Sequence, residues 1–383
     1  MVRQKRIWSH VLVSGDRRSI VPQYYYLKYI PKADRARVVG NLERLIGQLD
    51  REVPDKDSEQ TLLLATWNIR NFGKVRRLPE SLMYIAEILS RFDFVAVQEV
   101  VDLDDWRAVM DRLGPDYDFI ASDKTHHKLG SGGERLLYLY DKRKVRFQNI
   151  AGEIVLPTDM LITDDTAGEG GELFQGKQFR RSPFITAFQS GWFKFDICTV
   201  HLFYGSSSGS KLQQRVQEID RVADYFGDRA EQAQKEGRSL ILLGDFNIVH
   251  PDHETMTALK RHGFRIPNAL NRPSNLDLSK YYDQIAFMTD DDTLSFIDRQ
   301  TDDPKKANAG IFEIFKSVFR DGDTLEYEGE LRKKAGGKDK QGAALTKYYK
   351  GNWRTYQLSD HKPMWVRIKS NAAASYLAGL KAD

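Results

Sequence analysis

Two polar residues at the end of an apolar run are the first that could do chemistry. In the stretch RSLILLGDFNIVHPDHE, residues 238–254, a strand-like segment leads into Asp245 and Asn247. Their i, i+2 spacing in an extended chain turns both side chains to the same face, where a carboxylate and an amide could serve a polar site. An ordinary turn also favours Gly, Asp and Asn, because these residues tolerate tight backbone angles. The stretch alone leaves both interpretations open.

Acid, amide and imidazole side chains also stand at or beside the ends of other predicted strands. They are Asn68 (in ATWN), Glu99 (VAVQE), Glu134 (GERLLYLY), His201 (CTVH), Asp283 (YYDQIAF), and Asp360 and His361 (LSDHKP). Each one alone is explained as a strand-end residue that faces water. Together, on strands that lie side by side, they predict a polar cleft along one edge of the sheets.

The residue types in this set suit the hydrolysis of a phosphate ester. Carboxylate and amide oxygens without thiolates are the ligands of a hard cation, Mg²⁺ or its substitute Mn²⁺. Two histidines beside such a cation can exchange protons near neutral pH, and Glu134 and Asp283 are available to orient them. Arg180 or Arg181, in FRRSPF, could bind the phosphate.

Mixed β-sheets covered by helices are the elements expected to position these residues. The sequence predicts strands or hairpins at 61–69, 93–100, 132–145, 182–203, 238–246, 281–288 and 362–368. It predicts helices at 32–50 and 210–226, where apolar residues recur at three- and four-residue steps, and a third at 79–92 with Pro79 near its start. Short crossovers mixed with hairpins indicate one α+β domain over about residues 61–370.

Eight of these motifs, in this order, resemble the endonuclease/exonuclease/phosphatase superfamily and, within it, most resemble deoxyribonuclease I. They are WNIRNFG, VAVQEV, GERLLYLYDKRKV, RRSPFITAF, TVHL, LLGDFN, YDQIAF and SDHKP. The resemblance covers roughly residues 61–368. It implies a four-layer sandwich in which two packed mixed β-sheets are flanked by helices, with the site where the sheets meet.

The resemblance also implies metal and phosphate ligands. Glu99 would be the principal ligand of the metal ion, with Asn68 and Asp360 beside it. Arg181 stands two residues before Pro183, as in the Arg-x-Pro pattern of the superfamily, and would hold the phosphate.

Two histidine–carboxylate pairs complete the implied site. His201 would pair with Glu134 and act as the acid, and His361 would pair with Asp283 and act as the base. Asp245 and Asn247 would lie at the centre, where they orient water and bind a phosphate oxygen. Some members of the superfamily are described instead with the equivalent of Asp245 activating the water, and the sequence leaves this alternative open.

Some residues depart from the pattern of the secreted deoxyribonucleases. Those enzymes usually carry disulfides, whereas the one cysteine of this chain, Cys198, cannot form one internally and is expected to be buried. Two residues before the equivalent of Glu134 they place a tyrosine against DNA, and here that residue is Gly132. His126 and His127 lie in a polar loop and are not expected to be ligands.

Two basic segments flank a mildly acidic body. Residues 1–40 hold nine Lys or Arg against two acids, and residues 331–356 hold eight against one. Such clusters favour a polyanionic partner, although a flexible solvated loop is an alternative for the second segment. The expected divisions are a basic N-terminal extension with a helix (1–60), the catalytic domain (61–370) with a basic insertion at about 291–356, and a C-terminal tail (371–383).

The sequence therefore predicts a Mg²⁺-dependent nuclease that acts on DNA, with RNA as a further candidate substrate. One alternative is a phosphoesterase acting on a phosphoinositide, a sphingolipid or another small phosphorylated molecule. A catalytically inactive nucleic-acid-binding module is a third interpretation. The N-terminal residues contain no apolar stretch long enough for a signal peptide or a membrane span. The cytoplasm is thus the expected compartment, and no stable membrane association is expected.

Overall fold

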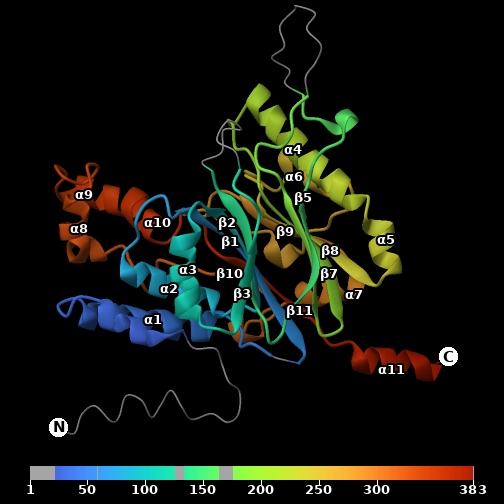
Figure 1. The fold of residues 1–383 in the computed structure, drawn as a ribbon, viewed down its shortest axis with the longest axis horizontal. Helices are drawn as coiled ribbons and strands as arrows, with labels where there is room; N and C mark the ends of the chain where they lie inside the picture. The colour runs from blue at the N-terminus through green and yellow to red at the C-terminus, as the bar shows by residue number, and fades with distance from the viewer. Residues whose placement is uncertain (1–21, 58, 126–132, 164–175, 383) are drawn as a thin grey trace, which may run out of the picture.

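Two β-sheets lie at the centre of the protein, with helices on both sides (Figure 1). The computed structural model describes residues 22–57, 59–125, 133–163 and 176–382. Gly132, His126 and His127, named above, lie outside these ranges. Within the described chain the first sheet has six strands and the second has five.

The first sheet has the strand order β10-β11-β1-β2-β4-β3. Its strands are β1 (Thr61–Phe72), β2 (Phe94–Val100), β3 (Tyr117–Ala121), β4 (Arg135–Asp141), β10 (Ala309–Ile311) and β11 (Met364–Lys369). β1 and β2 pair in parallel, whereas β11 pairs with β1, and β4 with β2, in antiparallel fashion. The sheet is therefore mixed, as predicted.

The second sheet has the strand order β5-β6-β7-β8-β9. Its strands are β5 (Arg146–Glu153), β6 (Phe184–Ser190), β7 (Phe193–His201), β8 (Arg238–Asp245) and β9 (Asp283–Met288). β6 and β7 form the hairpin predicted near Ser190, and Gly191 in its turn has a φ of +56°. β7 and β8 pair in parallel, so this sheet is mixed as well.

Alternation along β1 shows why both faces of the first sheet are covered. Leu62 and Leu64 point toward the second sheet, where they share a buried cluster with Phe188 and Ile241. Leu63 and Trp67 point the other way, into a cluster formed with the helices. Successive side chains of a strand face opposite sides, so a strand buried on both sides reads as a nearly continuous apolar run.

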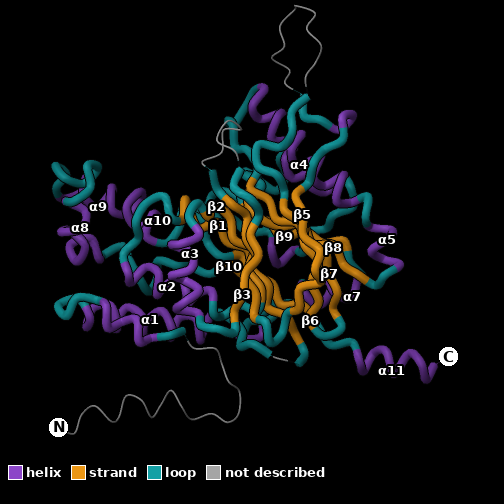
Figure 2. Tube along the Cα trace, in the orientation of Figure 1, coloured by secondary structure: helices purple, strands orange, loops and turns teal. Residues whose placement is uncertain are grey.

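Two sets of helices form the outer layers (Figure 2). α1 (Arg35–Glu52), α2 (Pro79–Leu89) and α3 (Leu103–Leu113) cover the first sheet, and α4 (Ser210–Gly227) and α6 (Glu254–Arg261) cover the second. Three further helices are α5 (Ala230–Lys235), α7 (Asp291–Ile297) and α11 (Ala373–Ala382). The predicted four-layer α+β sandwich is confirmed, and Cys198 is buried in the cluster under α4.

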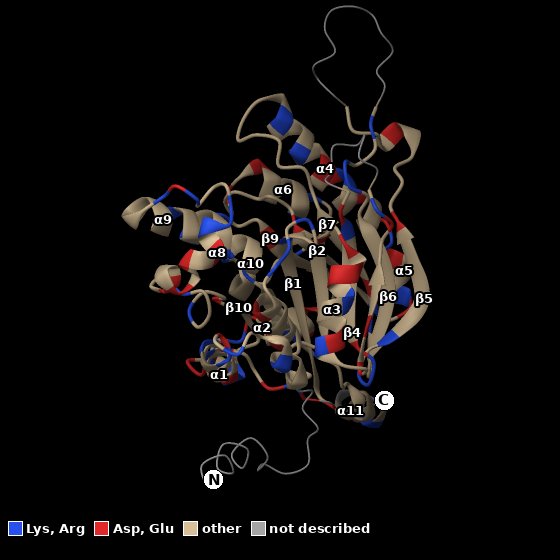
Figure 3. Cartoon of the chain, turned by 60° about the vertical axis from the view of Figure 1, so that its left-hand side comes forward, with Lys and Arg blue, Asp and Glu red and all other residues tan. Residues whose placement is uncertain are grey.

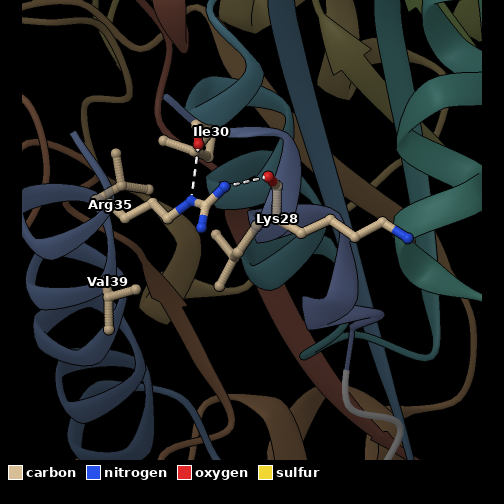
Figure 4. A pocket seen from close by; sticks show the side chains of 6 residues that line it. Lys28, Ile30, Arg35 and Val39 are labelled. Carbon is tan, nitrogen blue, oxygen red and sulfur yellow. Dashed lines mark hydrogen bonds between the residues drawn. The ribbon is translucent and has the colours of Figure 1, made fainter. Parts of the chain in front are cut away.

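The described residues before Thr61 pack directly on this sandwich. After the short helix η1 (Tyr24–Tyr29), Arg35 donates hydrogen bonds to the carbonyl oxygens of Ile30 at 2.9 Å and Lys28 at 2.6 Å, which close the turn into α1 (Figure 4). Leu45 and Leu49 of α1 are fully buried in the same cluster as α2 and β1. Helix α1 thus contributes to the outer layer of the first sheet.

A group of short helices lies beside α2 and projects from one side of the molecule (Figure 1). It consists of α8 (Glu328–Arg332), α9 (Gly342–Tyr348), a π-helical turn η7 (Tyr349–Trp353) and α10 (Arg354–Gln357). We refer to residues 328–357 as the helical arm. The rings of Tyr349 and Trp353 lie 5.9 Å apart, and both neighbour Tyr327 just before the arm. No helix in the described chain is long and apolar enough to cross a membrane.

Candidate active site

The polar residues predicted at strand ends meet at one end of the two sheets. Across the second sheet, His201 at the end of β7 lies opposite Asp245 of β8, which lies opposite Asp283 of β9. These register positions bring three chemically reactive side chains into one row. The parallel strands β7 and β8 end at the same edge, so the row needs no unusual loop.

His201 and Glu134 form the first histidine–carboxylate contact. The Nδ1 atom of His201 lies 2.8 Å from Oε1 of Glu134, just before β4. Both side chains are buried. Arg181 lies against the same carboxylate through its Nε atom and against the His201 carbonyl oxygen at 3.4 Å through Nη1. The carboxylate therefore orients an imidazole and a guanidinium together.

His361 and Asp283 form the second contact. The Nδ1 atom of His361 lies 2.7 Å from Oδ2 of Asp283, and the hydroxyl of Ser274 donates to the same oxygen at 2.6 Å. The Asp283 side chain is fully buried. Because Asp283 occupies the Nδ1 atom of His361, the Nε2 atom is the one that can face a reactant.

The two imidazoles converge on one carboxylate oxygen. Oδ2 of Asp245 lies 3.6 Å from Nε2 of His201 and 3.7 Å from Nε2 of His361. The same oxygen accepts a hydrogen bond from Asn68 at 3.0 Å. Asp245 thus marks the centre of the site, between two proton-carrying groups that arrive from different sheets.

The turn after β8 places Asn247 beside this centre. Asn247 has a φ of +54°, its backbone N–H donates to Asp245 at 2.9 Å, and its side chain donates to the carbonyl oxygen of Leu202 at 2.8 Å. Gly244 has a φ of +127°, and a Cβ atom there would overlap the carbonyl oxygen of Val200. The opening motif therefore forms a turn and also supplies two residues of the site.

Glu99 is aimed into the site by an irregularity in β2. The pairing of β2 with β4 shifts register between Val97 and Val100, and Glu99 has a φ of +63°. Its Oε1 atom accepts from Asn68 at 2.9 Å, and its Oε2 atom accepts from the backbone N–H of Asn71 at 2.6 Å. Strained backbone of this kind clusters at functional positions.

The donor set around Glu99 fits a hard divalent cation. Two groups of carboxylate and imidazole ligand atoms, each within 4.8 Å, occur in the described chain: Glu99, Glu134 and His201 in one, and Asp245, Asp283 and His361 in the other. Asn68 faces Glu99 with its side-chain N–H, and its amide oxygen accepts from the backbone N–H of Arg70 at 3.0 Å, so its metal-binding role stays a prediction. The carboxylate oxygens suit Mg²⁺ or Mn²⁺, and no thiolate lies among them.

Asp360 lies at the rim of the site, where it contacts the guanidinium of Arg70 and belongs to neither group of ligand atoms. Its Oδ2 atom is 3.3 Å from Nη1 of Arg70. Arg70 stacks on Tyr356 with 4.1 Å between its Cζ atom and the ring centre, and it also donates to the hydroxyl of Thr355. The metal-binding role predicted for Asp360 stays a prediction.

The charges of the site favour protonated imidazoles in the metal-free protein. Burial and Arg181 act to lower the pKa of His201, but the carboxylates of Glu134 and Glu99 outweigh them and raise it. Burial likewise opposes the charge of His361, yet Asp283 and Asp245 raise its pKa well above the usual value. Burial acts to raise the pKa of Glu134, whereas His201 and Arg181 lower it below its usual value.

Several residues that hold the site together were missed by sequence reasoning. Arg77 is buried, and its Nη2 atom donates to the carbonyl oxygens of Ile69 and Leu358 at 2.6 and 3.2 Å. The hydroxyl of Ser359 donates to the carbonyl oxygen of Asn68 at 2.5 Å. A signal for Ser359 was present in SDHKP, but nothing local to Arg77 shows that its partner Leu358 lies 281 positions further along the chain.

The fold and this arrangement of side chains place the chain in a family. Residues 65–361 match the Endonuclease/Exonuclease/phosphatase family, and the chain belongs to it.

Two relatives with similar sequences are deoxyribonucleases. The Deoxyribonuclease of Thioalkalivibrio sp. (strain K90mix) is 26% identical over 205 residues, which span 52% of this chain and 49% of that protein. Human Deoxyribonuclease-1 is 30% identical over 197 residues, or 49% of this chain and 61% of that protein. The matched region thus spans 49% and 61% of the length of these two relatives. A solved endonuclease/exonuclease/phosphatase from Bacteroides vulgatus is 13% identical, with 80% of this chain and 98% of that chain covered at a TM-score of 0.46.

Proposed function

We propose that this chain is a Mg²⁺-dependent phosphodiesterase and, more specifically, a nuclease that hydrolyses DNA, with RNA as a further candidate substrate. The observation that carries the proposal is the convergence of His201 and His361 on one oxygen of Asp245, at 3.6 and 3.7 Å. Two proton-carrying groups around one point suit a displacement in which one proton is taken and another is given. The names of the relatives support DNA as the substrate.

In the proposed reaction, water attacks phosphorus and the bond from phosphorus to the leaving ester oxygen breaks. His361, oriented by Asp283, takes a proton from the water in its neutral form, which a cation bound nearby would favour by opposing the charged imidazole. His201, oriented by Glu134, gives a proton to the leaving oxygen. Asp245 and Asn247 orient the water and bind a phosphate oxygen.

Charge on the phosphate is balanced by two cationic groups. Arg181 binds a phosphate oxygen while Glu134 fixes its position. Mg²⁺ held by Glu99 and Asn68, with Asp360 nearby, would stabilise negative charge on the phosphate oxygens.

One assay panel separates this proposal from its alternatives. The purified protein with Mg²⁺ is incubated with supercoiled plasmid, linear duplex DNA, RNA and a panel of phosphoinositides. Cleavage of DNA with little release of phosphate from the lipids supports the nuclease. Hydrolysis confined to the lipids would favour the small-molecule phosphoesterase, and binding of DNA without cleavage under all conditions would favour the inactive binding module.

A further inference from the structure

The C-terminal end of the helical arm lies at the rim of the candidate active site. Its last helix, α10, supplies Thr355 and Tyr356, which contact Arg70 two residues after Asn68. Gln357 accepts from the backbone N–H of Leu78 and the hydroxyl of Ser81, both at 2.9 Å. The arm is therefore joined to the strand end that carries the site, and the direction in which it leaves the site is set by these contacts.

The arm is also fixed at its far side. Tyr327 lies 5.2 Å from Trp353 and 6.1 Å from Tyr349, ring centre to ring centre. Arg37 of α1 covers the ring of Tyr327 at 4.6 Å and donates to its hydroxyl at 2.7 Å. Aromatic pairs of this kind stabilise packing beyond the area they bury. This packing argues against a flexible loop at Tyr349 and Trp353.

Half of the cations in the second basic segment, residues 331–356, form ion pairs with acidic residues of the protein. Lys333 contacts Glu330 at 2.6 Å, and Lys350 contacts Asp321 at 2.8 Å. Arg332 and Arg354 also contact acids, Glu328 and Asp321, both at 2.7 Å. These four cations already have acidic partners within the protein.

The other four cations are exposed and have no acidic partner within 4.0 Å in the described chain. They are Lys334, Lys338, Lys340 and Lys347. Figure 3 shows Lys and Arg positions, with Asp and Glu positions among them, around α8 and α9 on the side of the molecule where the arm projects. Lys340 lies 5.9 Å from the centre of the Tyr348 ring, and a cluster of cations without acidic partners is suited to a polyanion.

The reach of the arm matches several nucleotides. Residues 342–357 are helical without a break, and at about 1.5 Å per residue they span roughly 24 Å. Along one strand of a duplex, phosphates advance by about 3.4 Å per step, so this length corresponds to about seven steps. The helical stretch that ends at the Arg70 contact is therefore about as long as the backbone of several nucleotides, with Lys347 on it and the other three lysines in the turns before it.

We infer that the helical arm binds the sugar–phosphate backbone of DNA flanking the cleaved position, through Lys334, Lys338, Lys340 and Lys347. This inference rests on the proposed nuclease function and extends it to a surface outside the reacting groups. Phosphate contacts carry no direct sequence information, so the arm adds affinity without adding sequence preference.

The test compares three variants in a Glu99→Gln background, which prevents cleavage during binding. The first replaces the four arm lysines with Gln, and the second replaces them with Arg. The matched control replaces Lys142, Lys194, Lys260 and Lys381 with Gln, which are exposed lysines outside the arm. Fluorescence anisotropy with a 30-base-pair duplex gives the Kd at NaCl concentrations from 50 to 200 mM.

Each phosphate contact releases condensed counterions and contributes about 0.9 to the slope of log Kd against log salt. We expect the slope of the Gln variant of the arm to fall by up to about 3.6, and its Kd at 50 mM NaCl to rise at least tenfold. The Arg variant and the matched control should keep the slope of the parent protein. Circular dichroism checks that each variant is folded.

Two kinds of failure are distinguishable. A protein that cleaves plasmid DNA, but whose parent and arm variant share one salt slope, overturns the role of the arm and leaves the nuclease intact. A protein that neither cleaves nor binds DNA overturns both proposals. If the arm variant loses binding to anionic phospholipid vesicles while its affinity for DNA is unchanged, the arm binds a membrane surface and the inference is wrong.

Discussion

His201 and His361 differ in the charges that surround them, although each is oriented by a buried carboxylate. His201 and Arg181 both contact Glu134, so the positive charge of Arg181 offsets part of the attraction between this carboxylate and a protonated His201. His361 has no such competitor beside Asp283, whose second contact is the neutral hydroxyl of Ser274. The proton on His361 is therefore held more strongly in the metal-free protein.

Replacing either histidine tests the proposed proton transfers. His201→Ala and His361→Ala should each lower kcat on an unactivated phosphodiester by about 10² or more, the usual contribution of a general acid or base. His262→Ala is the control, because His262 contacts Asp220 and Asp224 of the outer helix α4. Near-normal turnover in both active-site variants would show that the assignment of the two histidines is wrong.

The pH dependence of stability should reveal the His361–Asp283 contact. Burial opposes the charged imidazole, but Asp283 and Asp245 outweigh it and raise the pKa of His361 in the folded protein well above 6.5. A raised folded pKa adds stability that is fully present below pH 6.5 and is lost as the pH rises through the folded value. In EDTA, the difference in unfolding free energy between the wild type and His361→Asn should follow this course in urea titrations. A difference that is constant between pH 5 and 9 would contradict it.

At the scale of elements, the backbone turns that aim the side chains matter as much as the strands. Gly244, Asn247 and Glu99 all have positive φ angles, in a region where residues other than glycine are uncommon. The first two lie around the end of β8, and the third lies where β2 loses its register with β4. The positions of Glu99 and Asn247 therefore depend on local irregularities that regular strand pairing would not provide, whereas His201, Asp245 and Asp283 are aligned by regular pairing.

Gly244→Ala tests this dependence. The new Cβ would meet the carbonyl oxygen of Val200 in the neighbouring strand and would also strain the backbone, so we expect a loss of more than about 2 kcal/mol in unfolding free energy. Gly237→Ala is the matched control, because Gly237 has a φ of +63° but a Cβ atom added there would meet no atom within 4 Å. Its cost should be about 1 kcal/mol from the backbone alone. Equal losses in urea unfolding would mean that the contact with Val200 is relieved at little cost.

The long strands and the helices of the sandwich could be predicted because their apolar periodicity is strong. Helix α1 was expected at 32–50 and is found at 35–52, and Pro79 does start α2. The three residues of β10 and the short helices of the arm could not be predicted, because contacts with distant residues stabilise them. Tyr327 has Arg37 as its neighbour, 290 positions earlier in the chain.

The same limit applies to the site. Strand ends are marked in the sequence by a change from apolar to polar residues, so the positions of Asp245 and His201 could be anticipated. The contact of Asp360 with Arg70, and of Arg70 with Tyr356, depends on how the arm packs, and no local pattern encodes that.

At the scale of the whole molecule, a bound cation would couple the site to global stability. A ligand that binds only the folded protein at ten times its Kd adds about 1.4 kcal/mol of stability. Mg²⁺ should therefore raise the melting temperature of the wild type, whereas Glu99→Gln should abolish that increase and nearly all hydrolysis. Differential scanning fluorimetry measures the first effect without depending on activity. Full hydrolysis in excess EDTA would exclude the metal mechanism.

The contact between α1 and Tyr327 has a consequence for how such a protein can change during evolution. Residues before Thr61 look dispensable beside the catalytic motifs, and so does the arm. Yet Arg37 and Asn41 of α1 both donate to the Tyr327 hydroxyl at the base of the arm. If either segment were lost during evolution, polar groups and apolar surface that are now buried in the remaining segment would become exposed to water. The two segments should therefore be inherited as one unit, gained together or lost together, although 290 positions separate Arg37 from Tyr327 in the chain.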